Sequence, residues 1–141
     1  MKLNFPFLLL SLSVLLIAAG CGRKVSFGGK VTFSDDGAPL TSGTVFFESP
    51  TLAAQGKINT DGTYTVGTDK MADGLPAGTY QVYLVGTEHT EIKAMPDGKS
   101  QSEIRTPVID PKYSSAGTSG LSVTVGGGTK KFDIQVERYV P

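Results

Sequence analysis

Short segments in which apolar and polar residues alternate run through most of the chain after residue 24. In the first of them, Val25, Phe27, Val31 and Phe33 alternate with polar or small residues, which is the period of a strand with one buried face. Gly29 interrupts this apolar row, and a glycine inside a strand often marks a bulge. We therefore predict a strand over residues 25–33 with a bulge at Gly29.

Further segments with strand character follow, each bounded by turn residues. Residues 55–60 and 63–66 flank Asp61-Gly62, a two-residue loop that favours positive φ and closes a twisted hairpin. The other predicted strands cover residues 44–48, 80–84, 121–125 and 132–136. About seven short strands, with no long stretch of helical apolar spacing, predict an all-β domain of the sandwich type.

The segment from Gly86 to Gly120 does not follow this pattern. It has no clear periodicity apart from a short strand candidate at residues 104–109. Compact domains seldom carry so long a loop without structure, so we expect an edge strand or a functional surface here. Pro96, Pro107 and Pro111 argue against a central strand, because proline cannot donate to a ladder.

The first 20 residues have the pattern of a bacterial lipoprotein export signal. Lys2 precedes an apolar run over residues 5–19, and Ala18-Ala19-Gly20 places small side chains directly before Cys21. We predict that residues 1–20 are removed, that Cys21 is lipidated, that residues 21–24 form a short tether and that residues 25–141 form the domain. The alternative is an ordinary secretory signal that leaves a lone thiol. A transmembrane helix is disfavoured because the apolar run is shorter than about 18 residues.

A lipidated Cys21 would hold the domain close to a membrane. Each buried methylene contributes roughly 0.8 kcal/mol, so a diacylated cysteine anchors stably. Arg23 and Lys24 either pair with anionic lipid or are solvated. Gly22, in place of Asp, resembles the residue after the cysteine in lipoproteins sorted to the outer membrane. The predicted location is therefore the bacterial cell envelope, at the outer membrane.

Composition narrows the classes of partner. The chain has 13 basic and 13 acidic side chains; removal of Lys2 with the signal leaves 12 against 13, a net charge of −1. The basic residues are scattered, with Lys130-Lys131 the longest run after the signal, so we expect no nucleic-acid partner. Cys21 is the single cysteine, so an internal disulfide is excluded and apolar burial must hold the fold.

Five motifs along the mature chain resemble one family of small envelope lipoproteins. They are residues 29–33 (Gly-Lys-Val-Thr-Phe), 39–45 (Pro-Leu-Thr-Ser-Gly-Thr-Val), 61–64 (Asp-Gly-Thr-Tyr), 74–80 (Gly-Leu-Pro-Ala-Gly-Thr-Tyr) and 118–121 (Thr-Ser-Gly-Leu). In this order they are similar to the carboxypeptidase regulatory-like, transthyretin-like lipoproteins abundant in planctomycetes. The resemblance implies a Greek-key sandwich of about seven strands. It implies no activity, because these motifs form turns and strands rather than a reactive site.

Catalytic and metal-binding readings find little support in the residues. The single histidine, His89, has no nucleophile at a spacing that any triad motif requires, so we expect no enzyme, no catalytic residue and no cofactor. Glu88, His89 and Glu91 are the best metal candidate, but three ligands within four residues of a loop rarely hold a geometry. A solvated turn is favoured, and no metal is expected.

Two functional hypotheses remain. In the first, the domain is a binding or adhesion module whose long segment, with His89 and Tyr113 as candidate surface residues, contacts an envelope protein or a glycan. In the second, it is a structural envelope lipoprotein or accessory subunit that acts through edge-strand pairing. Exposure of Phe46 or Tyr83 on the outward face of its strand would favour the second.

Lipidation of Cys21 is directly testable. We expect cells expressing the wild-type chain to incorporate a labelled fatty acid into the protein, and cells expressing Cys21→Ser to incorporate none, because the thiol is the acceptor. Gel fluorography after metabolic labelling measures this. Equal labelling of both chains, or recovery of the wild-type chain in the culture fluid with a free thiol, would contradict the prediction.

Overall fold

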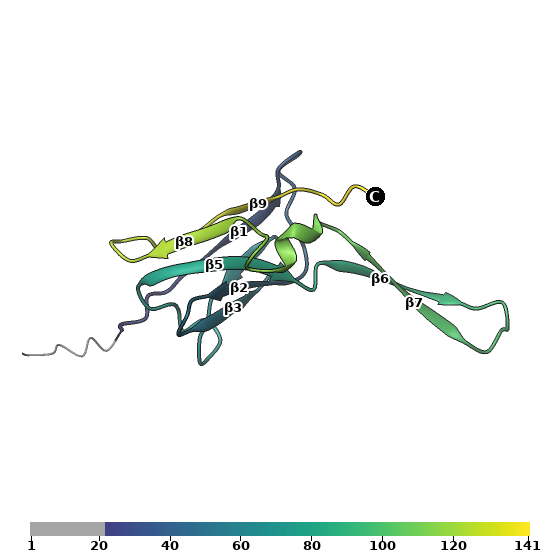
Figure 1. Cartoon of the computed structure of the whole chain (residues 1–141), viewed down its shortest axis with the longest axis horizontal. Helices are drawn as coiled ribbons and strands as arrows, with labels where there is room; N and C mark the ends of the chain where they lie inside the picture. Colours follow the sequence, from purple (N-terminus) through teal and green to yellow (C-terminus); the bar gives the residue numbers. More distant parts are fainter. Residues whose placement is uncertain (1–21) are drawn as a thin grey trace, which may run out of the picture.

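The computed structural model describes residues 22–141 and folds them into an all-β structure with no α-helix in that range (Figure 1). The predicted signal residues Ala18, Ala19 and Gly20 and the predicted lipidation site Cys21 lie outside the described residues. The strands are β1 (Gly28–Phe33), β2 (Thr44–Glu48), β3 (Ala53–Lys57), β4 (Thr63–Thr65), β5 (Gly78–Val85), β6 (Glu88–Ala94), β7 (Gln101–Pro107), β8 (Leu121–Val125) and β9 (Ile134–Val136), with a 3₁₀ turn, η1, at Pro111–Ser114. The predicted all-β class is confirmed.

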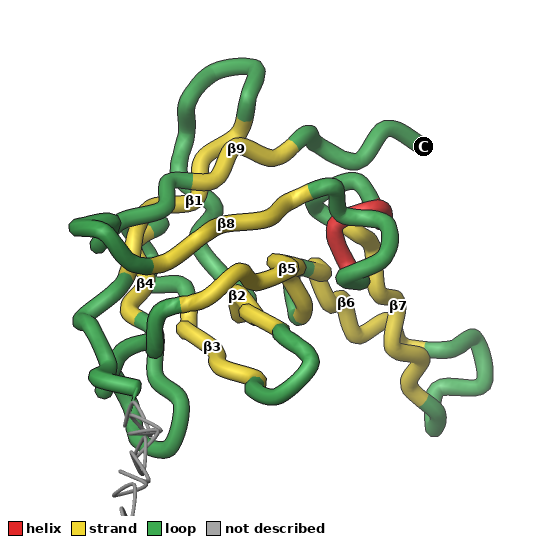
Figure 2. Tube along the Cα trace, turned by 60° about the vertical axis from the view of Figure 1, so that its left-hand side comes forward, coloured by secondary structure: helices red, strands yellow, loops and turns green. Residues whose placement is uncertain are grey.

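Two sheets form the body of the molecule. One has four antiparallel strands in the order β3-β2-β5-β8, and the other has three in the order β4-β1-β9. β1 pairs antiparallel with β4 through its first half and parallel with β9 through its second half. A separate two-stranded sheet, β6-β7, leaves the body to one side (Figure 2). Several sheets around one apolar core are consistent with the predicted sandwich.

The core is built by strand alternation. In β5, Tyr80, Val82 and Leu84 are 3, 0 and 0% exposed, while Gln81 between them is exposed. β1, β2 and β9 contribute in the same way, each burying every second residue: Val31, Phe33, Val45, Phe47, Ile134 and Val136. Burial of each large apolar side chain contributes about 1.5–3 kcal/mol, so these rows hold the two sheets together.

Gly29 is not at a bulge, and this part of the prediction is wrong. Its pairing with Tyr64 belongs to an uninterrupted register between β1 and β4. The glycine is needed for another reason: a Cβ at this position would lie 2.0 Å from the carbonyl oxygen of Phe132 and 3.0 Å from the Tyr64 hydroxyl. That hydroxyl donates a hydrogen bond to the same Phe132 oxygen. Gly29 therefore allows three chain segments to meet at one point.

The hairpin predicted around Asp61-Gly62 exists, but its loop has three residues instead of two. The Gly62 N–H donates to the Asn59 carbonyl at 2.9 Å and the Asn59 N–H to the Thr63 carbonyl at 2.8 Å, with Gly62 at a φ of 83°. This is a type I turn followed by a left-handed glycine. Asp61 accepts from the Thr63 N–H at 3.0 Å, which favours the longer loop. The arms also separate, because β3 pairs with β2 and β4 with β1.

The other strand predictions differ from the structure mainly at their ends. Residues 44–48 and 121–125 are strands with the predicted bounds. The first strand begins at Gly28 and the last at Ile134, later than predicted, because the flanking residues make only isolated bridges or loop contacts. The largest difference lies in residues 86–120, which contain the β6-β7 hairpin in place of a single short strand at 104–109.

Gly29→Ala should destabilise the fold by about 1–3 kcal/mol, because the new methyl group forces β1 away from the Phe132 backbone. Tyr64→Phe should cost about 1–3 kcal/mol by removing the donor to the Phe132 carbonyl. Urea denaturation monitored by circular dichroism measures both. Gly117→Ala is the matched control, since an added Cβ there meets no atom within 4 Å; an equal loss in Gly117→Ala would contradict the explanation.

Candidate functional site

The β6-β7 hairpin, residues 88–107, is the outlying element of the molecule, and we call it the arm. Its two strands pair antiparallel over seven residues each, from Glu88 opposite Pro107 to Ala94 opposite Gln101. Every residue of β6 is exposed, and in β7 only Ser102 and Pro107 are half-buried. Figure 1 shows the arm extending away from the two body sheets along the longest axis. Both faces of this ladder therefore contact solvent.

The tip of the arm is closed by local hydrogen bonds. The Gly98 N–H donates to the Met95 carbonyl at 3.0 Å, with Gly98 at a φ of 66°. The Asp97 carboxylate accepts from the N–H groups of Lys99 and Ser100 at 3.0 and 2.9 Å and from the Ser100 hydroxyl at 2.6 Å. These bonds, with that of the Ser100 hydroxyl foremost, lower the pKa of Asp97. The turn chemistry of this short segment sets the register of the arm.

The root of the arm is fixed to the body. The Val108 N–H donates to the carbonyl of the buried Thr87 at 3.1 Å. On the C-terminal side, the Tyr139 N–H donates to the Val108 carbonyl at 3.1 Å, and the Asp110 N–H to the Glu137 carbonyl at 3.0 Å. The arm is thus an ordered projection with a defined direction at its base.

Tyr113 was predicted as a surface residue for binding, and the structure shows that this is wrong. Its side chain is 6% exposed and belongs to the core. It lies in η1, where Pro111 begins a tight turn that folds back against β5. Its hydroxyl accepts a hydrogen bond from the Glu137 N–H at 3.4 Å. Tyr113 therefore packs the segment between β7 and β8 onto the body.

His89 lies in strand β6 and not in the solvated turn that the sequence favoured. Its Nε2 atom is 3.4 Å from Glu91 Oε1, and both side chains are about two-thirds exposed. Glu88 is the next residue along the strand, so its side chain points to the opposite face. Within residues 22–141 no group of three or more His, Cys, Asp or Glu is placed to hold a metal ion. The Glu88, His89 and Glu91 side chains do not converge.

Exposed apolar side chains occur on both faces of the arm. Ile92 is 70% exposed, Ile104 42% and Met95 44%. Directly opposite residues of an antiparallel pair share a face, so Ile92, opposite Glu103, and Ile104, opposite Glu91, lie on different faces. Residues 88–107 contain no Phe, Tyr or Trp. An isolated two-stranded ladder is marginally stable in water, so this element has backbone edges and apolar groups that a partner would cover.

Phe46 and Tyr83 form a second exposed feature, on the outer face of the four-stranded sheet. They are directly opposite in the β2-β5 register, and their rings stack at 5.2 Å with an interplanar angle of 12°. Both are half-buried. Burial raises the pKa of Tyr83, and the nearby Glu48 carboxylate raises it further. The outward direction of both side chains agrees with the strand parity read from the sequence.

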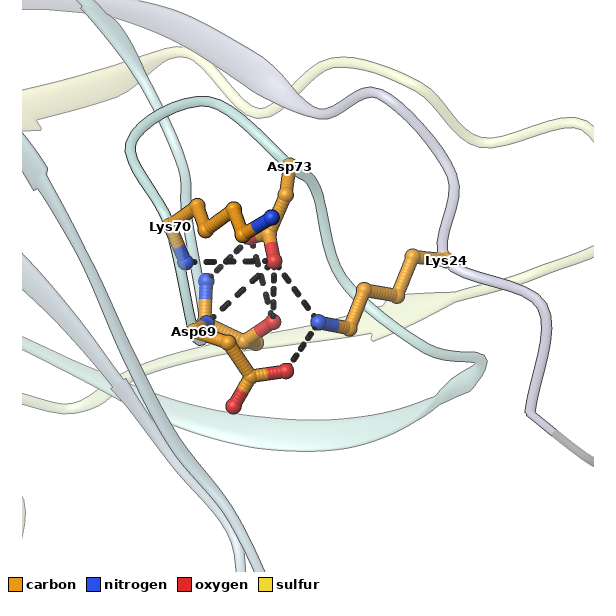
Figure 3. Close-up of polar contacts among 5 residues, drawn as sticks. Lys24, Asp69, Lys70 and Asp73 are labelled. Atoms are coloured by element: carbon orange, nitrogen blue, oxygen red, sulfur yellow. Dashed lines mark hydrogen bonds and ion pairs between the residues drawn. The ribbon is translucent and has the colours of Figure 1, made fainter.

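The first described residues are tied to the body at a polar cluster (Figure 3). Lys24 forms ion pairs with Asp69 and, at 2.7 Å, with Asp73. Val25 exchanges backbone hydrogen bonds with Leu75 at 2.8 and 2.9 Å. Lys24, which was expected to lie in a tether over residues 21–24, is therefore held against the body by two carboxylates.

Asp73 also organises the loop that receives Lys24. Its carboxylate accepts hydrogen bonds from the Thr68 N–H at 2.6 Å and the Lys70 N–H at 3.3 Å. The bond from Lys24 and then that from Thr68 lower the pKa of Asp73 well below its usual range. In Figure 1 these first described residues lie at the end of the longest axis opposite to the arm.

Comparisons with known proteins add no family. No protein-family model and no curated protein matches the chain. Among solved structures, a 9R-lipoxygenase from Cyanothece PCC8801 aligns with 80% of this chain at 13% identity and a TM-score of 0.35. The alignment covers 16% of the lipoxygenase chain, and a likeness of this size carries no functional argument. No helix among residues 22–141 has the length and apolar character needed to cross a membrane.

Sequence reasoning missed strand β6. Alternation reports burial of one face, and β6 buries neither face, so residues 88–94 carry no periodic pattern. A signal was available in Met95-Pro96-Asp97-Gly98, a turn sequence between two segments that contain threonine and isoleucine. Asp97-Gly98 is therefore the sequence feature that marks the turn of the arm.

Asp73→Asn should lower stability at neutral pH, because the folded state holds the ionised carboxylate against Lys24 and the loop N–H groups. The folded-state pKa of Asp73 lies below its unfolded value. Its contribution is therefore present above about pH 4 and is lost as the pH falls toward the folded-state value. Denaturant midpoints at pH 7 and pH 3 should show a gap between wild type and variant that narrows in acid.

Asp69→Asn is the control, because it removes only the second Lys24 partner, and it should have the smaller effect. A gap between wild type and Asp73→Asn that is independent of pH would contradict this account.

Proposed function

We propose that this protein is a non-catalytic, lipid-anchored protein of the bacterial cell envelope, held at the outer membrane through Cys21, whose arm binds an envelope protein. The body is a scaffold with an apolar core, and the arm is the recognition element. The observation that carries the proposal is the ladder of residues 88–107, which is exposed on both faces and rooted firmly at its base.

The position of Lys24 supports a short anchor. Residues 21–23 would be the whole connection between a lipidated Cys21 and the folded body, since Lys24 pairs with Asp69 and Asp73. Three residues span at most about 11 Å when fully extended. The anchored end of the body would stand close to the lipid headgroups, and the arm lies at the opposite end of the longest axis, away from the anchor.

The open edges of the arm favour a polypeptide partner. Unpaired N–H and C=O groups along a strand edge are met most fully by another strand. This brings together the two hypotheses from the sequence, because the arm is both the binding element and an edge-pairing element. A glycan is the second candidate. Phe46 and Tyr83 are half-buried rather than exposed, so they do not add support for edge pairing, and their flat stack is a surface on which a sugar ring could pack.

We further propose that the body is a Greek-key sandwich of the transthyretin-like, carboxypeptidase regulatory-like type. Support comes from the sheet orders β3-β2-β5-β8 and β4-β1-β9, in which several neighbours are far apart in the sequence. In this proposal Cys21 anchors the protein and the arm, residues 88–107, binds the partner; neither has a catalytic role. His89 in the arm is an exposed polar group beside Glu91.

Removal of the arm tests the proposed function. Residues 88–107 would be replaced by Asn-Gly, which can join Thr87 to Val108 because these residues are already hydrogen-bonded neighbours. We expect the shortened chain to keep its fold, because the core residues Ile109 and Tyr113 remain, and to lose the proteins captured by the wild-type chain from solubilised membranes.

Mass spectrometry of the captured proteins, with circular dichroism of both chains, gives the result. The matched control is Phe46→Ala/Tyr83→Ala, which removes the aromatic stack and leaves the arm intact. Capture that survives loss of the arm but fails in the control would overturn the protein-binding role of the arm and move the binding surface to the aromatic stack.

A further inference from the structure

The backbone groups on the outer edge of β6 can be assigned from the hydrogen bonds at its two ends. The Met95 N–H donates to Ser100 and the Thr87 carbonyl accepts from Val108, so these two residues point toward β7. N–H and C=O groups alternate sides along an antiparallel strand, so residues 89, 91 and 93 also point toward β7. Thr90, Ile92 and Ala94 therefore point their N–H and C=O groups outward, where no strand of residues 22–141 pairs with them.

This edge is complementary to itself. When two copies of β6 run antiparallel about a two-fold axis at Ile92, Ile92 faces Ile92 of the other copy and Thr90 faces Ala94. All of these are outward-pointing residues, so each pair can exchange two backbone hydrogen bonds. The same register places Glu91 opposite Lys93, twice, by symmetry.

The side chains in this register match in charge and polarity. Glu91 and Lys93 lie on one face and would form two reciprocal ion pairs, and opposite charges across strands are stabilising. Lys93 has no ion-pair partner among residues 22–141, and within the same range Glu91 pairs only with His89 Nε2, at 3.4 Å. On the other face, the two Ile92 side chains, each 70% exposed in the single chain, would cover one another.

We propose that the arm binds a second copy of this chain, through antiparallel pairing of the two β6 edges about a two-fold axis at Ile92. The result is a four-stranded sheet in the order β7-β6-β6-β7. This inference rests on the proposed function of the arm and names its partner. A two-fold interface of this kind is closed, so the pairing stops at two copies.

The outer edge of β7 is less suited to the same role. Pro107 lies opposite Glu88, a position whose backbone points outward in this register, so one donor is missing from that edge. Glu103 and Arg105 already form an ion pair with each other at 3.0 Å. Proline and satisfied charges on an edge are devices that discourage pairing, which leaves β6 as the edge open to a partner.

The pairing explains why an isolated ladder persists at this place. A two-stranded hairpin is marginal alone, whereas a four-stranded sheet is not. With the two-fold axis along the bilayer normal, both long axes would lie parallel to the membrane, and the two anchored ends would reach it at opposite ends of the pair. Anchoring also raises the effective concentration of the copies, so a modest contact is sufficient.

Charge exchange at Glu91 and Lys93 tests the inference. Lys93→Glu places Glu opposite Glu at both pairs, and Glu91→Lys places Lys opposite Lys. Each variant of the full chain is purified from the cell fraction, membrane or soluble, in which it is found. We expect each to dimerise at least about tenfold more weakly than wild type. An equimolar mixture of the two variants should form a one-to-one heterodimer with affinity near that of the wild-type homodimer, because both pairs are again opposite in charge.

Sedimentation velocity over a range of concentrations measures these species. Lys99→Glu at the tip of the arm is the matched control, with the same change of charge outside the pairing register, and it should dimerise like wild type. Recovery in the mixture also shows that both variants are folded. A wild-type chain that stays monomeric up to about 1 mM, or variants that dimerise as well as wild type, would overturn the self-pairing.

The outcome is separable from that of the proposed function. A monomeric wild-type chain whose captured proteins still depend on the arm would overturn self-pairing and leave the proposed function standing. Capture that is independent of the arm would overturn the proposed function, whether the chain is found in the membrane or the soluble fraction.

Discussion

The contact that the body depends on is the meeting of Tyr64, Gly29 and Phe132. The Tyr64 hydroxyl donates to the Phe132 carbonyl across a glycine that has no room for a side chain. Burial raises the pKa of Tyr64, so the phenol stays a neutral donor. This one point joins β4, the start of β1 and the segment that leads into β9. The pairing partner of β1 can therefore change from β4 to β9 along the strand while the three-stranded sheet still covers the core.

The body and the arm follow opposite physical rules. In the body, alternate residues of each strand are buried and the aromatic rings of Phe27, Phe47 and Tyr64 pack at 5.8 to 6.0 Å. In the arm, a local turn and a root hydrogen-bonded to the body position a ladder that has no core of its own. Folding of the body gives the arm its direction, and the arm adds strand edges whose backbone groups pair with no other strand of residues 22–141. The body and the arm are thus separate in space and in the interactions that stabilise them.

The polar cluster at Lys24 connects the folded body to the proposed lipid anchor at Cys21. Lys24 reaches two carboxylates, Asp69 and Asp73, that belong to a loop of the body. The first described residues are consequently part of the folded structure from residue 24 onward. A lipid at Cys21 would therefore be joined to the body through only three residues, 21–23, at the end opposite to the arm. Anchor and recognition element would then operate without obstructing one another.

The amino-acid sequence by itself determined the strands that bury one face. The rows of Val31 and Phe33 in β1 and of Tyr80, Val82 and Leu84 in β5 were readable because a period of two reports one-sided burial. It also indicated turns at glycine and aspartate, and an N-terminal signal that remains a prediction because it lies outside the described residues. Tertiary structure decided which strands pair, that Gly29 serves close approach, that Tyr113 is buried, and that residues 88–107 form an arm. These depend on contacts between distant segments, or on exposure of both faces, and neither leaves a local pattern in the sequence.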